Sequence, residues 1–306
     1  MVKGPAVPPI ALVLAAVVSV QFGGALAVLL LPLIGVIGSV TLRLGLAAAI
    51  VTIAVRPALR GRSRADWLTV CIFAVALTTM NLAFYGSLAR LPIGVAVTIE
   101  FLGPLTLAAV LSKRSADGIA VVAALGGVVL IAELFSTSWD QIDLIGVGLA
   151  LLAGACWAAY IVASGRTGAR FAGLDGIAIC MVIGTALMVP ITALVVGAGI
   201  GPGEAGGLGA LGAAISTPQV LGLGLAVALL SSAVPYSLEL LALRHLSAGV
   251  FGVLLSLEPA VAALAGLLLL GQRLEPAQLA GMALVVSASI VVLGRPRTPQ
   301  PGPAAA

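Results

Sequence analysis

Long apolar runs, separated by short polar segments, make up most of the chain. Ten of these runs reach roughly 20 residues, the length that a helix rising about 1.5 Å per residue needs to cross a bilayer core. Backbone amides cannot stay unpaired in lipid, and the runs lack the alternating pattern of barrel strands. The pattern therefore predicts an all-α polytopic membrane protein with ten transmembrane helices. Their approximate limits are 10–31, 34–55, 67–88, 93–112, 118–134, 144–164, 176–196, 219–243, 248–270 and 276–293.

Lysine and arginine residues are distributed unequally over the loops that join these runs. Short cytoplasmic loops of membrane proteins carry an excess of positive charge. If the N-terminus lies in the cytoplasm, the inner loops and ends collect twelve of the 15 basic residues. The outer loops then hold only Arg90 and Arg273, and Arg43 lies inside a run. The charges predict that the N- and C-termini both face the cytoplasm.

An internal repeat relates the two halves of the sequence. Gly94 and Pro104 stand ten positions apart in the fourth run, as do Gly249 and Pro259 in the ninth. We expect a first five-helix repeat over 1–138, a second over 139–295 and a disordered tail over 296–306. Because five is odd, the second repeat would enter the membrane from the opposite side, as in many secondary transporters. The Gly- and Ala-rich segment 197–212 is expected to be a flexible outer connection.

The composition supports lipid surroundings and narrows the possible partners. Hydrophobic residues make up 61% of the 306 residues and charged residues 8%, whereas a soluble domain carries about 25% charged residues. The net charge of +4 is spread over many loops, which argues against a nucleic-acid partner. The three cysteines lie inside apolar runs without a short spacing, so we expect neither a disulfide framework nor a metal site.

The sequence lacks the motifs of common enzymes and cofactor sites. It has no Gly-Lys-Ser/Thr phosphate-binding loop, so ATP is not the energy source within this chain. His245 is the only histidine, which excludes a histidine-based metal site and a Ser/His/Asp triad. A membrane enzyme would need a convergent catalytic set, and none is found. We expect no cofactor, no metal and no enzymatic activity.

Ionisable residues inside the runs are the strongest candidates for function, because each costs roughly 2.5 to 3.5 kcal/mol at a helix centre. Glu100 lies near Gly103 and Pro104, where its helix can pack closely or bend. It is expected to exchange a proton or to bind a substrate ammonium group. The alternative is a structural role in which Glu100 only pairs with Arg43.

Three further charged residues leave their roles open. Arg43 could hold a substrate carboxylate bidentately or neutralise a glutamate between helices. Glu258 precedes Pro259, which is expected to kink the ninth helix, and it could bind substrate or stabilise packing. Glu239 lies near Arg244, so an ion pair at the membrane boundary is favoured for it.

Uncharged polar and aromatic residues within the runs could complete a moderately polar substrate site. Each of them, taken alone, is more easily explained by helix packing or by anchoring at the membrane interface. The candidates for substrate binding are Asn81, Tyr85, Trp157, Tyr160 and Tyr236, with Gln21, Ser231 and Ser232 as further polar positions.

Four segments resemble a known family. The span layout and the glutamate-proline regions are similar to the EamA-type carriers of the drug/metabolite transporter superfamily, and two of the segments resemble its threonine/homoserine exporter branch. One departure is Gln272, where the family commonly has glutamate after Leu-Gly. The segments are Val97-Thr98-Ile99-Glu100-Phe101-Leu102-Gly103-Pro104-Leu105, Gly154-Ala155-Cys156-Trp157-Ala158-Ala159-Tyr160, Pro235-Tyr236-Ser237-Leu238-Glu239 and Ser256-Leu257-Glu258-Pro259-Ala260.

The resemblance implies an inner-membrane exporter of threonine, homoserine or related amino acids, driven by the proton gradient. Its partners would be a small-molecule substrate, the proton and the lipid bilayer. The leading hypothesis places a zwitterion between Glu100 and Arg43, with Glu100 also carrying the coupled proton, and exposes the site alternately to the two sides. The second hypothesis is a carrier of the same fold for another small metabolite or drug.

Overall fold

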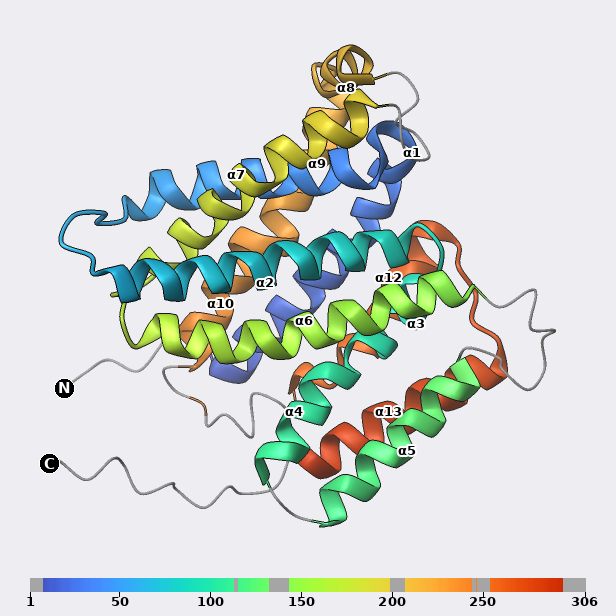
Figure 1. The fold of residues 1–306 in the computed structure, drawn as a ribbon. Helices are drawn as coiled ribbons and strands as arrows, with labels where there is room; N and C mark the ends of the chain where they lie inside the picture. The colour runs from blue at the N-terminus through green and yellow to red at the C-terminus, as the bar shows by residue number, and fades with distance from the viewer. Residues whose placement is uncertain are drawn as a thin grey trace, which may run out of the picture.

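The computed structural model describes residues 8–112, 115–131, 143–198, 207–243, 246 and 254–293. Within these ranges the chain is helical and contains no strand, which confirms the predicted all-α class. Gly249, Arg244 and the predicted tail 296–306 lie outside the described residues. The helices are α1 (Pro9–Val55), α2 (Arg64–Leu88), α3 (Ile93–Glu100), α4 (Leu102–Ser112), α5 (Ser115–Ile131), α6 (Leu144–Gly168), α7 (Asp175–Gly197), α8 (Gly207–Ile215), α9 (Pro218–Ala228), the π-helical segment η2 (Leu229–Ala233), α10 (Val234–Leu243), α12 (Glu258–Leu270) and α13 (Pro276–Leu293) (Figure 1).

Five of the described helical segments are long and apolar enough to cross a membrane by themselves: α1, α2, α6, α7 and the continuous stretch Pro218–Tyr236. Shorter apolar helices cover Ile93–Leu107, Glu258–Leu270 and Pro276–Val291. The chain is therefore a multi-pass helical membrane protein. The count of ten spans, the inverted arrangement and the boundary between the two repeats stay predictions.

The first two predicted spans correspond to two helical arms of α1 that meet at a kink. Pro32 lies inside α1 and lacks a backbone N–H, and Gly35 has non-helical angles, with φ 67° and ψ 178°. A residue with a side chain would be strained at this positive φ, whereas glycine is not. Figure 1 shows α1 as two arms that run in different directions. The break between the two arms thus lies within a few residues of the boundary predicted between the first two spans.

The prediction of a flexible connection over 197–212 is wrong for its last residues. Helix α8 begins at Gly207, whose positive φ of 66° glycine adopts without strain. Leu211 on α8 packs so closely on α1 that a Cβ at Gly38 would lie 2.9 Å from its Cδ1 atom. This apolar contact orders a segment for which composition alone had predicted a linker.

Helices that are distant in sequence pack along one another. Helix α2 lies along α6, α13 along α5, and α1 against α7, α9, α10 and α12. In Figure 1, α5 and α13 form a pair at one side of the bundle. The central helices α1, α2, α3, α6 and α10 all reach the middle of the molecule, where the candidate polar residues lie.

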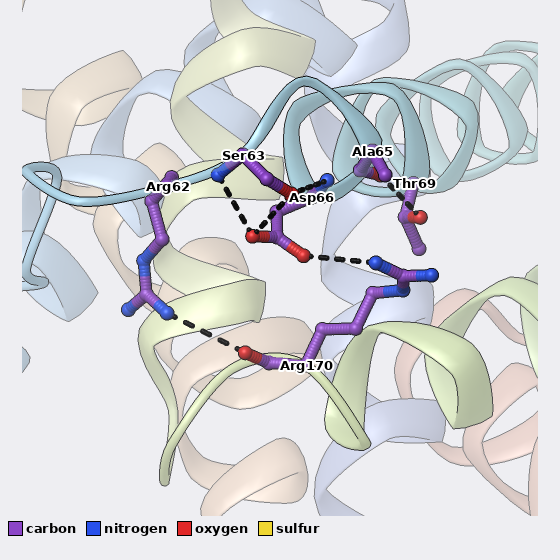
Figure 2. A network of polar contacts seen from close by, with 6 residues as sticks. All are labelled: Arg62, Ser63, Ala65, Asp66, Thr69 and Arg170. Atoms are coloured by element: carbon purple, nitrogen blue, oxygen red, sulfur yellow. Dashed lines mark hydrogen bonds and ion pairs between the residues drawn. The ribbon is translucent and has the colours of Figure 1, made fainter.

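Ion pairs join the loops at one end of the α2–α6 pair. Arg62 contacts Asp175 at 3.0 Å. Arg170, just after the end of α6, contacts Asp66 at 3.0 Å, as Figure 2 shows. The Arg62 guanidinium also lies 4.5 Å from the Phe171 ring centroid. Two of the loops that the charge pattern assigns to the cytoplasm, those that carry Arg62 and Arg170, therefore lie at the same end of the bundle.

At the opposite end, Arg90 contacts Asp143 at 2.9 Å. Burial acts to raise the pKa of Asp143, but hydrogen bonds from the Gly146 amide and from Arg90 outweigh it and lower the pKa. Such partly exposed pairs contribute only about 0 to 1 kcal/mol each, so they align the helix ends more than they stabilise the fold.

A matched pair of glycines tests the packing of α5 on α13. A Cβ at Gly127 would lie 2.7 Å from the Gly281 carbonyl oxygen, whereas a Cβ at the adjacent Gly126 would meet nothing within 4 Å. We expect Gly127→Ala to lower the thermal stability of the detergent-solubilised protein, because overpacking costs about 1 to 3 kcal/mol. Gly126→Ala is the control and should leave the melting temperature unchanged; equal melting curves for both variants would contradict this packing.

Candidate functional site

Arg43 is the centre of the buried polar cluster. It lies on the second arm of α1 with only 6% of its surface exposed. Its Nη1 donates to the Asn81 side-chain oxygen and, at 3.5 Å, to the Tyr85 hydroxyl. Its Nε donates to the Ser232 hydroxyl at 3.2 Å, and its Nη2 donates to the Ser231 carbonyl oxygen at 3.0 Å. One guanidinium therefore links α1, α2 and η2.

All four acceptors around Arg43 are neutral groups. A guanidinium has five N–H donors, so these contacts leave one donor, on Nη2, without a described partner. The Arg43 guanidinium also lies 5.4 Å from the Tyr85 ring centroid. Among the described residues, no carboxylate forms an ion pair with Arg43. The structural alternative, a direct ion pair between Arg43 and Glu100, is therefore not observed.

Glu100 is the last residue of α3, at the point where the helix is interrupted before α4 begins at Leu102. The Glu100 side chain is only 7% exposed and accepts no hydrogen bond from a described residue. Arg43 is close enough to attract its carboxylate through space. Glu100 is thus a buried acidic group whose hydrogen-bonding capacity is left open for a ligand or a proton.

Helix α6 packs against the backbone at Glu100. A Cβ at Gly154 would lie 2.5 Å from the Glu100 carbonyl oxygen, so the glycine allows the two backbones to touch. Trp157, one turn later, stacks edge-on against Phe101 with the ring centroids 5.7 Å apart. The candidate Trp157 therefore contacts Phe101, the residue that follows Glu100.

Glu258 is the first residue of α12 and is 6% exposed. Gln21, on the first arm of α1, donates to its Oε2 atom at 3.2 Å. Glu258 lies within electrostatic range of both Glu100 and Glu239. The helix is interrupted at Ser256 and Leu257, just before Pro259, and Pro259 lies in the first turn of α12, where its missing N–H costs no hydrogen bond.

The π-helical segment η2 supplies backbone acceptors as well as side chains. The Leu230 carbonyl oxygen accepts from the Ser19 hydroxyl at 2.7 Å, and the Ser231 carbonyl oxygen accepts from Arg43. Short π segments are frequent at functional sites because they free such groups from the regular helix ladder. Ser19 was missed by the sequence reasoning, because nothing in the apolar run around it signals a partner 211 positions away.

Tyr160 and Tyr236 meet on the other side of the cluster. Their hydroxyl groups lie close enough to interact, and Tyr236 is also within electrostatic range of Arg43. The Tyr160 ring packs on Phe73 with a centroid distance of 5.0 Å. Both tyrosines are half-buried. The structure thus brings all eight candidates into one connected region, in which Arg43, Asn81 and Tyr85 are joined directly.

The chemistry available here is that of binding and of charge exchange. Within the described residues, no group of three or more His, Cys, Asp or Glu side chains is arranged to hold a metal ion. The cluster combines one fixed cation, buried carboxylates, hydroxyl groups and aromatic faces. Such a set suits a small zwitterionic molecule, whose two charges need opposite partners inside the membrane.

Known proteins resemble this sequence over nearly its whole length. The EamA-like transporter family matches residues 144–294. The threonine/homoserine exporter RhtA of Escherichia coli (strain K12) is 39% identical over 288 residues, which cover 94% of this chain and 92% of that protein. RhtA of Salmonella typhimurium (strain LT2) is 38% identical over the same shares of the two chains. The chain belongs to the EamA-like transporter family, in the branch that contains these RhtA proteins, which are exporters and not enzymes.

Proposed function

We propose that this protein exports threonine, homoserine or a closely related small amino acid from the cytoplasm and couples this export to protons. The identity of 39% to the RhtA exporter over 94% of the chain carries this proposal. The buried cluster around Arg43 and Glu100 supports it, because an amino acid presents a carboxylate and an ammonium group together. The protein would lie in the inner membrane with both termini in the cytoplasm.

In this proposal the two charges of the substrate are recognised by different residues. The Glu100 carboxylate, which has no described hydrogen-bond donor, binds the ammonium group. Arg43 offers its remaining Nη2–H to the substrate carboxylate, so it makes one hydrogen bond and not the bidentate pair that was one alternative from sequence. Asn81 and Tyr85 hold the guanidinium in place, and Glu258 adds a second acidic group nearby.

Proton coupling follows from competition at Glu100. A buried carboxylate is stable in an apolar surrounding only when a cation or a proton neutralises it. If the substrate ammonium and the proton bind alternately, each can leave only on exchange for the other. One molecule of substrate would then move outward as a proton moves inward, and the proton gradient would drive export.

Alternating access would use the inverted repeat. Helical structure is interrupted at Phe101, between α3 and α4, and again at Ser256 and Leu257, before α12. These interruptions precede Pro104 and Pro259, the prolines that correspond in the repeat, by two or three residues. Discontinuous helices at corresponding positions of two halves are a common feature of transporter binding sites. Each break can serve as the point at which its half bends.

Transport into liposomes containing the purified protein tests the proposal. Labelled threonine and homoserine should accumulate when a pH gradient is imposed, and a protonophore should abolish the gradient-driven part. Transport that is insensitive to the gradient would overturn the proton coupling. Movement of an unrelated metabolite or drug, with no transport of any amino acid in the panel, would favour the second hypothesis instead.

A further inference from the structure

A group of aromatic rings and one carboxylate lies between the Arg43 cluster and the end of the bundle that carries Arg170. We name Phe73, Tyr160, Tyr236 and Glu239 the inner aromatic group. Helix α6 ends at Gly168, close to the Arg170–Asp66 pair, and Tyr160 lies about two turns before this end. Helix α10 runs toward the same end, because α7 starts there at Asp175 and α9 returns from the far side after α8.

The register of α10 connects the inner aromatic group to the Arg43 cluster. Ser232, Tyr236 and Glu239 are spaced by four and three residues, which places them in succession on one face of the helix. Ser232 accepts a hydrogen bond from Arg43, and Glu239 lies one turn before the end of α10. This face therefore leads from the centre of the bundle toward the end with the predicted cytoplasmic loops.

Three side chains of this group keep some accessible surface, whereas Phe73 is buried. Tyr160, Tyr236 and Glu239 each keep an intermediate share of accessible surface. The two tyrosines nevertheless pack against the hydrophobic core that contains Phe73. Helices α6 and α10 do not pack extensively along each other, so the tyrosine side chains bridge the distance between them. These three side chains are therefore not sealed within the packed core.

The predicted spans contain more acidic than basic side chains, so a bound cation would balance their charge. Arg43 is the one basic residue inside the predicted spans, whereas Glu100, Glu239 and Glu258 supply three carboxylates. Among the described residues, no basic side chain forms an ion pair with Glu239; Arg244, the partner favoured from sequence, lies outside them. A carboxylate near half-buried tyrosine rings can attract an ammonium group through its charge and through the ring quadrupoles.

We propose that Glu239, with the ring faces of Tyr160 and Tyr236, binds the ammonium group of the substrate on the inner side, before the substrate reaches Glu100. This inference rests on the proposed function, since it assumes that a small amino acid moves outward past α10. The site would raise the local concentration of the cationic group near the central cluster. It would also discriminate against anionic metabolites at the inner opening.

Inhibition by tetramethylammonium from one side of the membrane tests this inner ammonium site. The probe is permanently charged, has no carboxylate and interacts with aromatic faces. Threonine uptake would be measured in inside-out vesicles, whose cytoplasmic face is accessible, and in right-side-out vesicles. We expect the wild type to be inhibited from the cytoplasmic face only. In Glu239→Gln, the inhibition constant should rise on the order of tenfold, because the carboxylate contact is lost.

Two tyrosine variants separate this role from a structural one. Tyr236→Phe keeps the ring face and should keep the inhibition, whereas Tyr236→Leu should weaken it like Glu239→Gln. Glu275→Gln removes an exposed carboxylate before α13 and serves as the control for charge. Unchanged inhibition in both Glu239→Gln and Tyr236→Leu, or equal inhibition from both faces, would overturn the inference. A wild type that carries no amino acid at all would instead overturn the proposed function.

Discussion

Cells that lack their own exporters and produce the Glu100→Gln protein are expected to lose resistance to excess threonine and homoserine. Glutamine has nearly the same shape as glutamate, but it carries no negative charge and cannot exchange a proton. Glu100 is buried and has no hydrogen-bond donor among the described residues, so its substitution removes no contact that holds the fold together. The variant should therefore fold and reach the membrane, but fail in transport.

The expected size of the Glu100→Gln effect follows from the interaction that is lost. A hydrogen bond to a charged group contributes about 1.5 to 3 kcal/mol, and about 1.4 kcal/mol corresponds to a factor of ten in affinity. Substrate binding should thus weaken by roughly ten- to a hundredfold. Loss of proton exchange would come in addition, and it would leave any remaining transport insensitive to a pH gradient.

Glu275→Gln is the matched control for Glu100→Gln. It makes the same chemical change at an exposed position before α13 and should preserve resistance at the wild-type level. The measurement is growth across a series of threonine and homoserine concentrations, with the amount of protein in the membrane fraction determined for each variant. Wild-type resistance in cells that carry Glu100→Gln would refute the role given to this carboxylate.

Sequence alone predicted the residues of the polar cluster better than their contacts. Arg43, Asn81 and Tyr85 stand out because polar groups are rare and costly in apolar runs, and they do share one buried network. A direct pair of Arg43 with Glu100 was one of the alternatives, yet the acceptors of Arg43 are amide, hydroxyl and carbonyl oxygens. These include the Ser231 carbonyl oxygen of η2, a backbone atom that every residue carries and that no sequence pattern marks.

The exact positions of the helix interruptions were also not predictable from sequence. Pro104 and Pro259 suggested bends in their helices, and interruptions do occur nearby, but at Phe101 and at Ser256 and Leu257. Proline tolerates a position at the start of a helix, so it marks where a new helix begins and not where the previous helix ends. The residue at the first interruption is set by tertiary contacts, among them the close approach of α6 to Glu100.

Gln272 shows how a departure from the family pattern can be compatible with the structure. Its side-chain oxygen accepts a hydrogen bond from the Ile93 amide, at the start of α3, at 3.0 Å. A glutamate oxygen could accept the same bond, but the amide does so without adding a charge. The contact ties the segment between α12 and α13 to the helix that carries Glu100. Position 272 therefore acts here as a neutral acceptor.

Gly103→Ala is expected to destabilise the protein severely. A Cβ at this position would lie 1.8 Å from the Gly154 carbonyl oxygen and 2.3 Å from the Gly154 carbonyl carbon. Both atoms belong to the backbone of α6, so no side-chain rotation can relieve the overlap. Helices α4 and α6 would have to separate, and the contact between Gly154 and the Glu100 backbone would open with them. Overpacking typically costs about 1 to 3 kcal/mol, and a collision between two backbones should lie at the upper end of this range or above it.

Gly148→Ala provides the comparison for Gly103→Ala, because a Cβ at Gly148 on α6 would meet nothing within 4 Å. Thermal unfolding of both variants in detergent, followed by size-exclusion chromatography of the remaining soluble protein, measures the difference. Gly148→Ala should match the wild type, while Gly103→Ala should give a low yield and a clearly reduced melting temperature. Because the collision lies one turn from Glu100, any Gly103→Ala protein that does fold should also transport poorly. Normal stability and normal transport of Gly103→Ala would show that α4 and α6 are not in backbone contact, and the position assigned to Glu100 beside α6 would then be wrong.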